Sequence, residues 1–204
     1  MQDIVQYFIN TIFNLLLFSF IPFLWWVFFY RKKERFLSWI GIKKPVIKNK
    51  RVFILLFSLF LVISIVSSFL PTIVDRSLTS TGQLNGVGIS AVFQVLLFGL
   101  IQTGASEEIL FRGFLGKRFI KRFGFNVGNT MQAVLFGLLH IAVLFLVTSV
   151  DIYQGLLVFT LPCIVGWFFG YVNEKLSEGS IIPSWLMHGI GNVIASSITI
   201  VFFS

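Results

Sequence analysis

An uncharged apolar run of 27 residues, Ile4–Tyr30, limits what this chain can fold into more than any other feature. A helix needs about 20 consecutive apolar residues to cross the hydrocarbon core of a bilayer. Of the 204 residues in the chain, 12% are charged, whereas a typical soluble domain has about 25%. The sequence therefore predicts an integral membrane protein and argues against a soluble globular domain.

Further apolar runs predict an all-α, polytopic helix bundle with about six transmembrane helices. No internal repeat and no linker divides the sequence, so we expect residues 1–204 to form a single integral membrane domain. The expected spans are Ile4–Tyr30, Val52–Val74, Ile89–Gly116, Val127–Val150, Tyr153–Val172 and Ile181–Phe203.

Basic residues collect between these spans. Nine of the sixteen lie in Arg31–Arg51, and four more lie in Lys117–Arg122, which we expect to be a loop. Together with Lys175, 14 basic residues fall on one side of the membrane, while the opposite side holds only Arg76. The positive-inside rule then predicts a multi-pass protein of the cell membrane whose two termini are both extracytoplasmic.

The basic clusters also indicate the partners of the chain. Clusters of Lys and Arg beside membrane helices attract anionic lipid headgroups, so we expect membrane lipids and no nucleic acid as partners. Within the first cluster the segment RFLSWIGI, residues 35–42, suits either an interfacial segment on the membrane surface or an ordinary loop.

Five acidic, basic or histidine residues lie inside the expected spans: Glu107, Glu108, Arg112, His140 and His188. An ionisable group at the bilayer centre costs about 2.5–3.5 kcal/mol on insertion scales, so such residues are candidates for function. The alternative is a structural network that only ties helices together. Counted from the basic side, Glu107, His140 and His188 reach similar depths along their helices. This favours one shared active site in the cytoplasmic half of the bundle.

The spacing of the acidic pair separates its two roles. Neighbouring residues on a helix point about 100° apart, so Glu107 and Glu108 are expected to face different partners. Glu108 precedes Arg112 by four residues, which is the favourable orientation for an ion pair. That pairing leaves Glu107 to face the cavity, where a carboxylate is suited to act as a general base.

Two further pairs are separated by four residues and so share a helix face. His188 and Asn192 form one pair, and two such donors are able to stabilise a developing oxyanion. Phe136 and His140 form the other, in which we expect the phenyl ring to pack against the imidazole and hold it in place.

The stretches EEILFR, FGLLH and HGIGN resemble the EExxxR, FxxxH and HxxxN motifs of the CPBP family of intramembrane proteases, also called the Abi or type II CAAX endopeptidase family. The resemblance covers about residues 90–200 and marks them as the catalytic core. It implies that Glu107 and His140 activate water for peptide-bond hydrolysis, while His188 and Asn192 stabilise the oxyanion. Two more motif residues would support the site: Glu108 and Arg112.

Within that family the short chain favours the bacterial branch, which includes peptide-processing and bacteriocin-immunity proteins, because members of the eukaryotic branch, which trim prenylated CAAX proteins, usually have more helices than the six expected here. A prenylated substrate is less expected in the bacterial branch. The expected substrate is then a membrane-embedded or membrane-associated peptide or protein. Two other functions stay open: a non-catalytic bacteriocin-immunity or scaffold membrane protein, and a proton-coupled transporter. The transporter is disfavoured because such folds usually carry internal repeats and discontinuous helices, neither of which is seen in the sequence.

The residues leave the cofactor undecided. Glu107, His140 and His188 provide three N and O ligands with a fourth position for water, as a catalytic zinc ion requires. The chain has no HExxH pair, however, and the same residues suit a metal-free glutamate-type site. We favour the metal-free site slightly over zinc.

Overall fold

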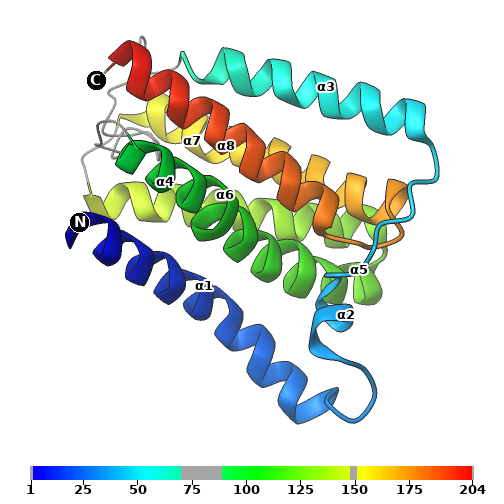
Figure 1. Cartoon of the computed structure of the whole chain (residues 1–204). Coiled ribbons are helices and arrows are strands. Elements are labelled where there is room, and N and C mark those ends of the chain that lie inside the picture. The colour runs from blue at the N-terminus through cyan, green and yellow to red at the C-terminus, as the bar shows by residue number, and fades with distance from the viewer. Residues whose placement is uncertain (1, 70–88, 148–150, 204) are drawn as a thin grey trace. The chain divides into compact units, whose positions relative to one another are not determined.

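The structure is a computed structural model of the chain, and it describes residues 2–69, 89–147 and 151–203. Within these residues every element is a helix, which confirms the predicted all-helical fold (Figure 1). In chain order the helices are α1 (Gln2–Phe29), α2 (Phe36–Ile40), α3 (Lys50–Ser67), α4 (Ile89–Leu96), η3 (Leu97–Ala105), η4 (Glu108–Gly116), α5 (Lys117–Phe123), α6 (Phe125–Val147), α7 (Ile152–Tyr171), η5 (Val172–Leu176) and α8 (Ile182–Phe203).

Among the described residues, five helical stretches are long and apolar enough to cross a membrane: Ile4–Phe29, Ile89–Phe123, Phe125–Leu146, Ile152–Leu176 and Ile182–Phe202. The second expected span is described only as far as α3 extends, because residues 70–74 lie outside the described residues. Residues 148–150, at the end of the fourth expected span, and Arg76 lie outside them too. The multi-pass membrane architecture is confirmed, and the orientation of the termini stays a prediction.

The chain divides into two compact units, and each is described by itself. The first unit comprises Met1–Glu34, Asn49–Glu108 and Trp185–Ser204. Here α1 packs against α4 and η3. The hydroxyl oxygen of Thr11 in α1 lies 3.3 Å from Gln102 Oε1 in η3. In the same unit, α3 runs alongside α8 (Figure 1).

The helix that carries Glu107 has π-helical geometry on both sides of this residue, in η3 and η4. Hydrogen bonds in a π-helix join residues five apart, and such wide turns are rare and frequently found at functional sites. Side-chain hydrogen bonds in η3 and at its C-cap, Ser106, follow the same spacing. Thr103 donates to the carbonyl of Phe98, and Ser106 donates to the carbonyl of Ile101. The wide turns thus change the register of the helix where the acidic pair sits.

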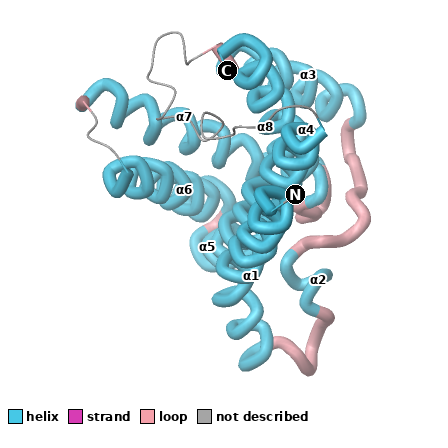
Figure 2. Tube along the Cα trace, turned by 60° about the vertical axis from the view of Figure 1, so that its left-hand side comes forward, coloured by secondary structure: helices cyan, strands magenta, loops and turns pink. Residues whose placement is uncertain are grey.

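The second unit comprises Arg35–Lys48 and Ile109–Ser184. Helices α6 and α7 pack side by side, and α5 packs against α6 (Figure 2). Buried amides of α6 bind backbone carbonyls of α7: Asn129 Nδ2 donates to Trp167 at 2.8 Å, and Gln132 Nε2 donates to Gly166 at 2.9 Å. These hydrogen bonds join the two helices where the apolar surroundings provide few competing partners.

The expected loop at Lys117–Arg122 is wrong, because these residues form the helix α5. The connection to α6 is reduced to Gly124, whose φ of 78° suits a glycine. The guanidinium of Arg118 lies 3.5 Å from the centre of the Trp39 ring, so this cation has a partner while it remains helical. A cluster of basic residues alone therefore did not indicate where the helix ends.

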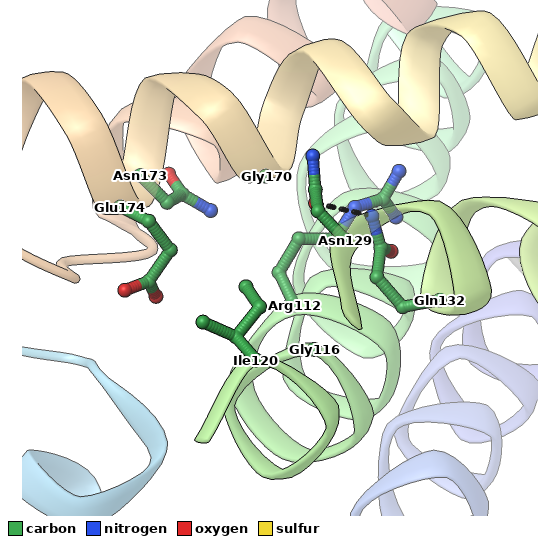
Figure 3. A pocket seen from close by; sticks show the side chains of 8 residues that line it. All are labelled: Arg112, Gly116, Ile120, Asn129, Gln132, Gly170, Asn173 and Glu174. Carbon is green, nitrogen blue, oxygen red and sulfur yellow. Dashed lines mark hydrogen bonds between the residues drawn. The ribbon is translucent and has the colours of Figure 1, made fainter. Parts of the chain in front are cut away.

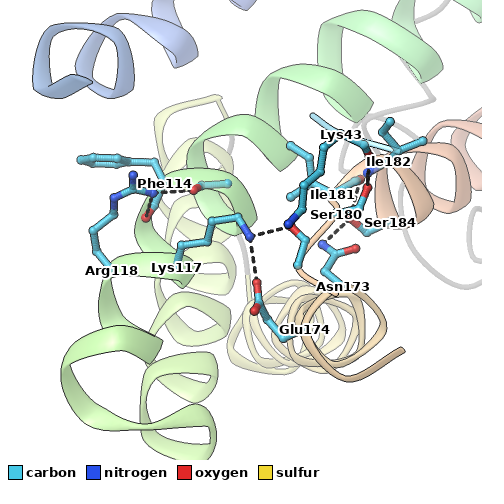
Figure 4. A network of polar contacts seen from close by, with 12 residues as sticks. Lys43, Phe114, Lys117, Arg118, Asn173, Glu174, Ser180, Ile181, Ile182 and Ser184 are labelled. Atoms are coloured by element: carbon cyan, nitrogen blue, oxygen red, sulfur yellow. Dashed lines mark hydrogen bonds and ion pairs between the residues drawn. The ribbon is translucent and has the colours of Figure 1, made fainter. Parts of the chain in front are cut away.

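Residues 35–42 form the short helix α2 and its closing turn at Gly41. Two side chains of α2 are buried, with exposures of 7% and 0%: Trp39 and Ile40. The backbone amide of Ile181 donates to the Gly41 carbonyl at 2.9 Å, and the Ser180 hydroxyl donates to the Lys43 carbonyl (Figure 4). The segment is thus docked by hydrogen bonds to the backbone carbonyls of Gly41 and Lys43.

Candidate active site

Helix α8 places His188 beside the acidic pair of the first unit. The imidazole Nδ1 lies 3.2 Å from Glu108 Oε1, and Nε2 lies 3.7 Å from Glu107 Oε2. All three side chains are largely buried, with exposures of 11% for His188, 13% for Glu107 and 0% for Glu108. Both neighbouring carboxylates therefore contact one imidazole, each at a different ring nitrogen. The sequence did not predict this arrangement, because helical spacing led us to expect different partners for Glu107 and Glu108.

The two carboxylates differ in how they contact the ring. The Glu108 distance is within hydrogen-bonding range, whereas 3.7 Å to Glu107 is too long for a hydrogen bond. Within the described part of the chain, Glu107 Oε2 is buried and accepts no hydrogen bond. A buried acceptor without a donor needs an explanation, and a catalytic role is a common one. Glu108 therefore orients the imidazole, while Glu107 keeps an oxygen that can accept a proton.

Asn192 lies one helical turn beyond His188 and contacts the same helix, as the spacing of four predicts. Its Nδ2 donates to Thr103 Oγ1 at 2.8 Å. Close to these contacts, Trp185 Nε1 donates to the carbonyl of Leu100 at 2.6 Å. A Cβ added at Gly189 would lie 3.2 Å from both the Gly99 carbonyl oxygen and the Leu100 Cα, so glycine allows α8 to approach the η3 backbone closely. Helix α8 is thereby held in register against η3.

The remaining motif residues lie in the second unit. The Phe136 and His140 rings meet edge to face with centroids 4.5 Å apart, which confirms that Phe136 packs against the imidazole. The guanidinium of Arg112 lies 4.0 Å from the centre of the Phe136 ring, on the buried side of η4. Arg112 thus supports Phe136, and its pairing with Glu108 stays a prediction.

The hydrogen bond of His140 defines which ring nitrogen carries a proton. Nδ1 lies 2.8 Å from the carbonyl oxygen of Phe136, one turn earlier on α6. Because a carbonyl only accepts, the Nδ1 atom must donate, and the lone pair of the neutral ring then lies on Nε2. His140 is therefore held in the tautomer that can take a proton through Nε2.

A narrow hollow in the second unit lies near Arg112 and does not contain the predicted catalytic residues (Figure 3). It is lined by polar residues of η4, α6 and η5, among them Gln132 and Asn173, and it has no room for a water molecule. Its amides mainly serve α6–α7 packing, since Asn129 Nδ2 donates to the carbonyl of Trp167 and Gln132 Nε2 donates to the carbonyl of Gly166, both on α7. We therefore regard the hollow as part of the helix packing.

Of the three expected zinc ligands, Glu107 and His188 lie in the first unit and His140 lies in the second. No group of three or more His, Cys, Asp or Glu side chains in the described ranges is arranged to hold a metal ion. Both ring nitrogens of His188 face carboxylates, and Nε2 lies 3.7 Å from Glu107 Oε2. The metal-free site therefore stays a prediction.

Sequence reasoning missed two residues that hold this site together: Thr103 and Trp185. Both are polar groups within apolar helices, and each donates or accepts a hydrogen bond between η3 and α8. Polar residues in membrane helices often join neighbouring helices in this way, so their presence was the available signal. The sequence could not name their partners, because η3 and α8 are about 85 residues apart in the chain.

Comparison with known proteins agrees with these motifs. A family model described as type II CAAX prenyl endopeptidase Rce1-like matches residues 87–194, which is just over half of the chain. Comparisons with curated proteins and with solved structures gave no match. The matched range includes every motif residue from Glu107 to Asn192. The chain belongs to the Rce1-like family of type II CAAX prenyl endopeptidases, which are intramembrane proteases.

Proposed function

We propose that this protein is an intramembrane endopeptidase that hydrolyses a peptide bond of a membrane-embedded or membrane-associated peptide or protein. The observation that carries the proposal is the buried Glu107 carboxylate oxygen beside His188, which accepts no hydrogen bond from the described residues. A carboxylate in an apolar span is costly, and a structural role would have provided it with donors. Family membership supports the same chemistry.

In the proposed mechanism, Glu107 and His140 activate the attacking water. The water gives one proton to this pair, and its oxygen attacks the carbonyl carbon of the scissile bond. The accepted proton then passes to the leaving amine nitrogen as the carbon–nitrogen bond breaks. General base and acid catalysis of this kind contributes about 10²–10⁴-fold to the rate. The tautomer of His140 supports the role, since Nε2 carries the lone pair.

His188 and Asn192 would stabilise the oxyanion that forms on the carbonyl oxygen. Asn192 has two N–H groups, and one of them already donates to Thr103, so the second remains for the substrate. For His188 the Glu108 carboxylate holds the ring in one orientation. Donors that are fixed before the reaction stabilise the transition state because they need little reorganisation.

Peptidomics of membrane fractions tests the proposal and identifies the substrate. Cells carrying the wild type are compared with Glu107→Gln and His140→Ala. The expected result is that both variants lose the same cleavage product and accumulate its uncleaved precursor. Glu178→Gln is the control, because its side chain is 49% exposed and belongs to none of the three motifs.

Other results would overturn the proposal. If no cleavage product depends on Glu107 or His140 while the cellular phenotype persists in both variants, the protein acts as a non-catalytic immunity or scaffold protein. A proton-coupled transporter would instead show an altered pH dependence of flux in Glu107→Gln. Peptide processing or bacteriocin immunity is the proposed biological setting, and the identity of the accumulated precursor tests it.

A purified assay complements the cellular one. The protein in nanodiscs is given a fluorophore–quencher peptide with a farnesylated CAAX end, the substrate class that the family description names. We expect cleavage by the wild type and about 10³-fold less by Glu107→Gln. Chelator treatment of the same preparation decides the cofactor question, and a metal-free site keeps its full rate after chelation.

A further inference from the structure

We infer that Thr103 is a positioning residue that sets the orientation of the Asn192 side-chain amide in the catalytic site. The inference rests on the proposed function, because Asn192 is proposed to bind the oxyanion. Thr103 lies in the π-helical segment η3, four residues before Glu107. Its hydroxyl contacts the Asn192 amide directly, at 2.8 Å.

The direction of each hydrogen bond follows from the groups involved. Thr103 Oγ1 lies 2.8 Å from the carbonyl oxygen of Phe98, and a carbonyl can only accept. The hydroxyl proton therefore points to Phe98, and the lone pairs of Thr103 Oγ1 are left for Asn192. Only the NH₂ end of the amide can donate to them. The side chain of Asn192 is thus held with nitrogen, not oxygen, against Thr103.

This orientation has a direct chemical consequence for Asn192. An amide NH₂ has two donors, and Thr103 takes one of them, which leaves the second N–H at a defined angle. If the amide turned over, it would present a carbonyl oxygen, which repels an oxyanion. Thr103 therefore selects the amide orientation that is useful for catalysis. Valine has the same shape as threonine but lacks the hydroxyl, so it removes the selection alone.

Thr103 is suited to this task because its own position is well determined. The hydroxyl is bound to the backbone of its own helix, five residues back. The neighbouring helix α8 is fixed against η3 by the Trp185 indole on the Leu100 carbonyl and by the close approach of Gly189. The donor and acceptor of the Thr103–Asn192 bond are therefore held by separate anchors on both helices, which limits the freedom of the amide.

Kinetics on the farnesylated peptide tests the catalytic half of the inference. We expect Thr103→Val to lower kcat about 10-fold with little change in KM, because the amide acts on the transition state. Thr103→Ser keeps the hydroxyl and should restore most of the rate. Ser106→Ala is the matched control: it removes a hydroxyl that binds a carbonyl five residues back in the same helix.

A double variant shows whether Thr103 acts through Asn192. Asn192→Ala removes an oxyanion donor and should lower kcat by about 10²–10³-fold. In that background Thr103→Val should have no further effect, since the amide it orients is gone. A full additional loss in the double variant would overturn the inference, because the hydroxyl would then act by another route.

Side-chain amide NMR provides a readout that needs no catalysis. In ¹⁵N-asparagine-labelled protein, the Asn192 cross-peak is the one that Asn192→Ala removes. We expect this cross-peak to move in Thr103→Val and to stay near its wild-type position in Thr103→Ser and Ser106→Ala, while the other asparagine cross-peaks show that each variant is folded. An Asn192 cross-peak unmoved by Thr103→Val overturns the inference.

The two arms separate the failure of this inference from the failure of the proposed function. If the wild-type protein leaves the peptide intact and peptidomics finds no product, the proposed function fails, and the NMR arm still decides whether Thr103 orients Asn192. If the protein cleaves, and the cross-peak moves in Thr103→Val without a change in kcat, then the positioning role is wrong although the contact exists.

Discussion

Two clusters of ionisable side chains in this apolar chain differ in how fully their polar atoms are hydrogen-bonded. In the second unit, Lys117 Nζ lies 3.1 Å from Glu174 Oε1 and donates to the carbonyl of Gly179 at 2.6 Å (Figure 4). In the first unit, two carboxylates share one imidazole, that of His188. The Lys117 cluster pairs one cation with one anion, whereas the His188 cluster includes a buried carboxylate oxygen, Glu107 Oε2, that accepts no hydrogen bond from the described residues.

The difference distinguishes a structural cluster from a functional one. A partly buried ion pair with additional hydrogen bonds is neutral and satisfied, so it stabilises a turn and has little reason to exchange protons. A buried cluster with an acceptor oxygen left over is costly unless the protein uses it. We therefore expect substitutions in the His188 cluster to change the rate of cleavage and those in the Lys117 cluster to change stability.

The largest expected effect comes from replacing a carboxylate by its amide in each cluster. Glu107→Gln should lower kcat on the farnesylated peptide by about 10³-fold and leave the thermal unfolding temperature nearly unchanged. Glu174→Gln should do the reverse, with near-normal cleavage and a lower unfolding temperature. Measuring both quantities for both variants in nanodiscs checks the comparison. Equal loss of cleavage in the two variants would contradict the distinction between a functional and a structural cluster.

A smaller effect on the rate is expected at Glu108. Its carboxylate holds the His188 ring through Nδ1, and Glu108→Gln replaces an acceptor-only group with one that can also donate. We expect kcat to fall about 10²-fold because the ring loses its orientation. Glu108→Asp, which keeps the charge but shortens the side chain, shows whether reach or charge matters. A wild-type rate in Glu108→Gln would contradict the orienting role.

For stability, the largest loss is expected at Gly41. Its φ of 95° is unfavourable for other residues, and an added Cβ would lie 2.8 Å from both the Gly179 carbonyl oxygen and the Lys117 side chain. Gly41→Ala should reduce the free energy of unfolding by about 3 kcal/mol. Denaturation in mixed micelles measures it. The matched control is Gly124→Ala, which also has positive φ but no atom within 4 Å of the added Cβ.

Removing the cation of the Lys117 cluster should have the next effect. Lys117→Met keeps the length of the side chain but removes its contacts with Glu174 and Gly179. We expect about 2 kcal/mol of lost stability, less than for a fully buried pair, since the side chains are 20% and 24% exposed. Cleavage should persist below the unfolding temperature. Loss of cleavage in a fully folded Lys117→Met protein would show that the cluster also serves catalysis.

The smallest effect is expected at the exposed pair of Lys48 and Glu178. These groups lie 3.8 Å apart with side chains 56% and 49% exposed. Exposed ion pairs contribute little, so Lys48→Gln should change the free energy of unfolding by less than about 0.5 kcal/mol. The same micelle titration measures it at low and high salt. A loss of stability as large as that of Lys117→Met would mean that the difference in burial does not determine how much each ion pair contributes.

Much of the site was predictable because spacing on a helix determines which side chains share a face. His188 and Asn192 contact the same neighbouring helix, and Phe136 packs on His140, as their spacing of four residues indicates. Phe136 and His140 belong to one regular helix, α6, so their contact is local. The meeting of His188 with both glutamates was not predictable. It depends on how α8 lies against a helix whose turns are π-helical.

The helices and the membrane location were determined by the sequence itself. In the hydrocarbon core of a membrane, backbone N–H and C=O groups must form hydrogen bonds with each other. The uncharged apolar run Ile4–Tyr30 achieves this by forming a helix. The three motifs likewise lie within apolar runs, so the order of residues alone assigns their polar side chains to the membrane. These features depend on composition and on spacing along one helix, which the linear order of residues contains.

The tertiary structure alone decided which of these groups meet. The continuation of the helix through Lys117–Arg122, the docking of α2 and the bond between Thr103 and Asn192 all depend on partners from distant parts of the chain. Each is a short-range interaction, so it exists only once packing has brought two separate segments within a few ångströms. The residues proposed to react could be read from the sequence, whereas the contacts between distant helices that hold them in place could not.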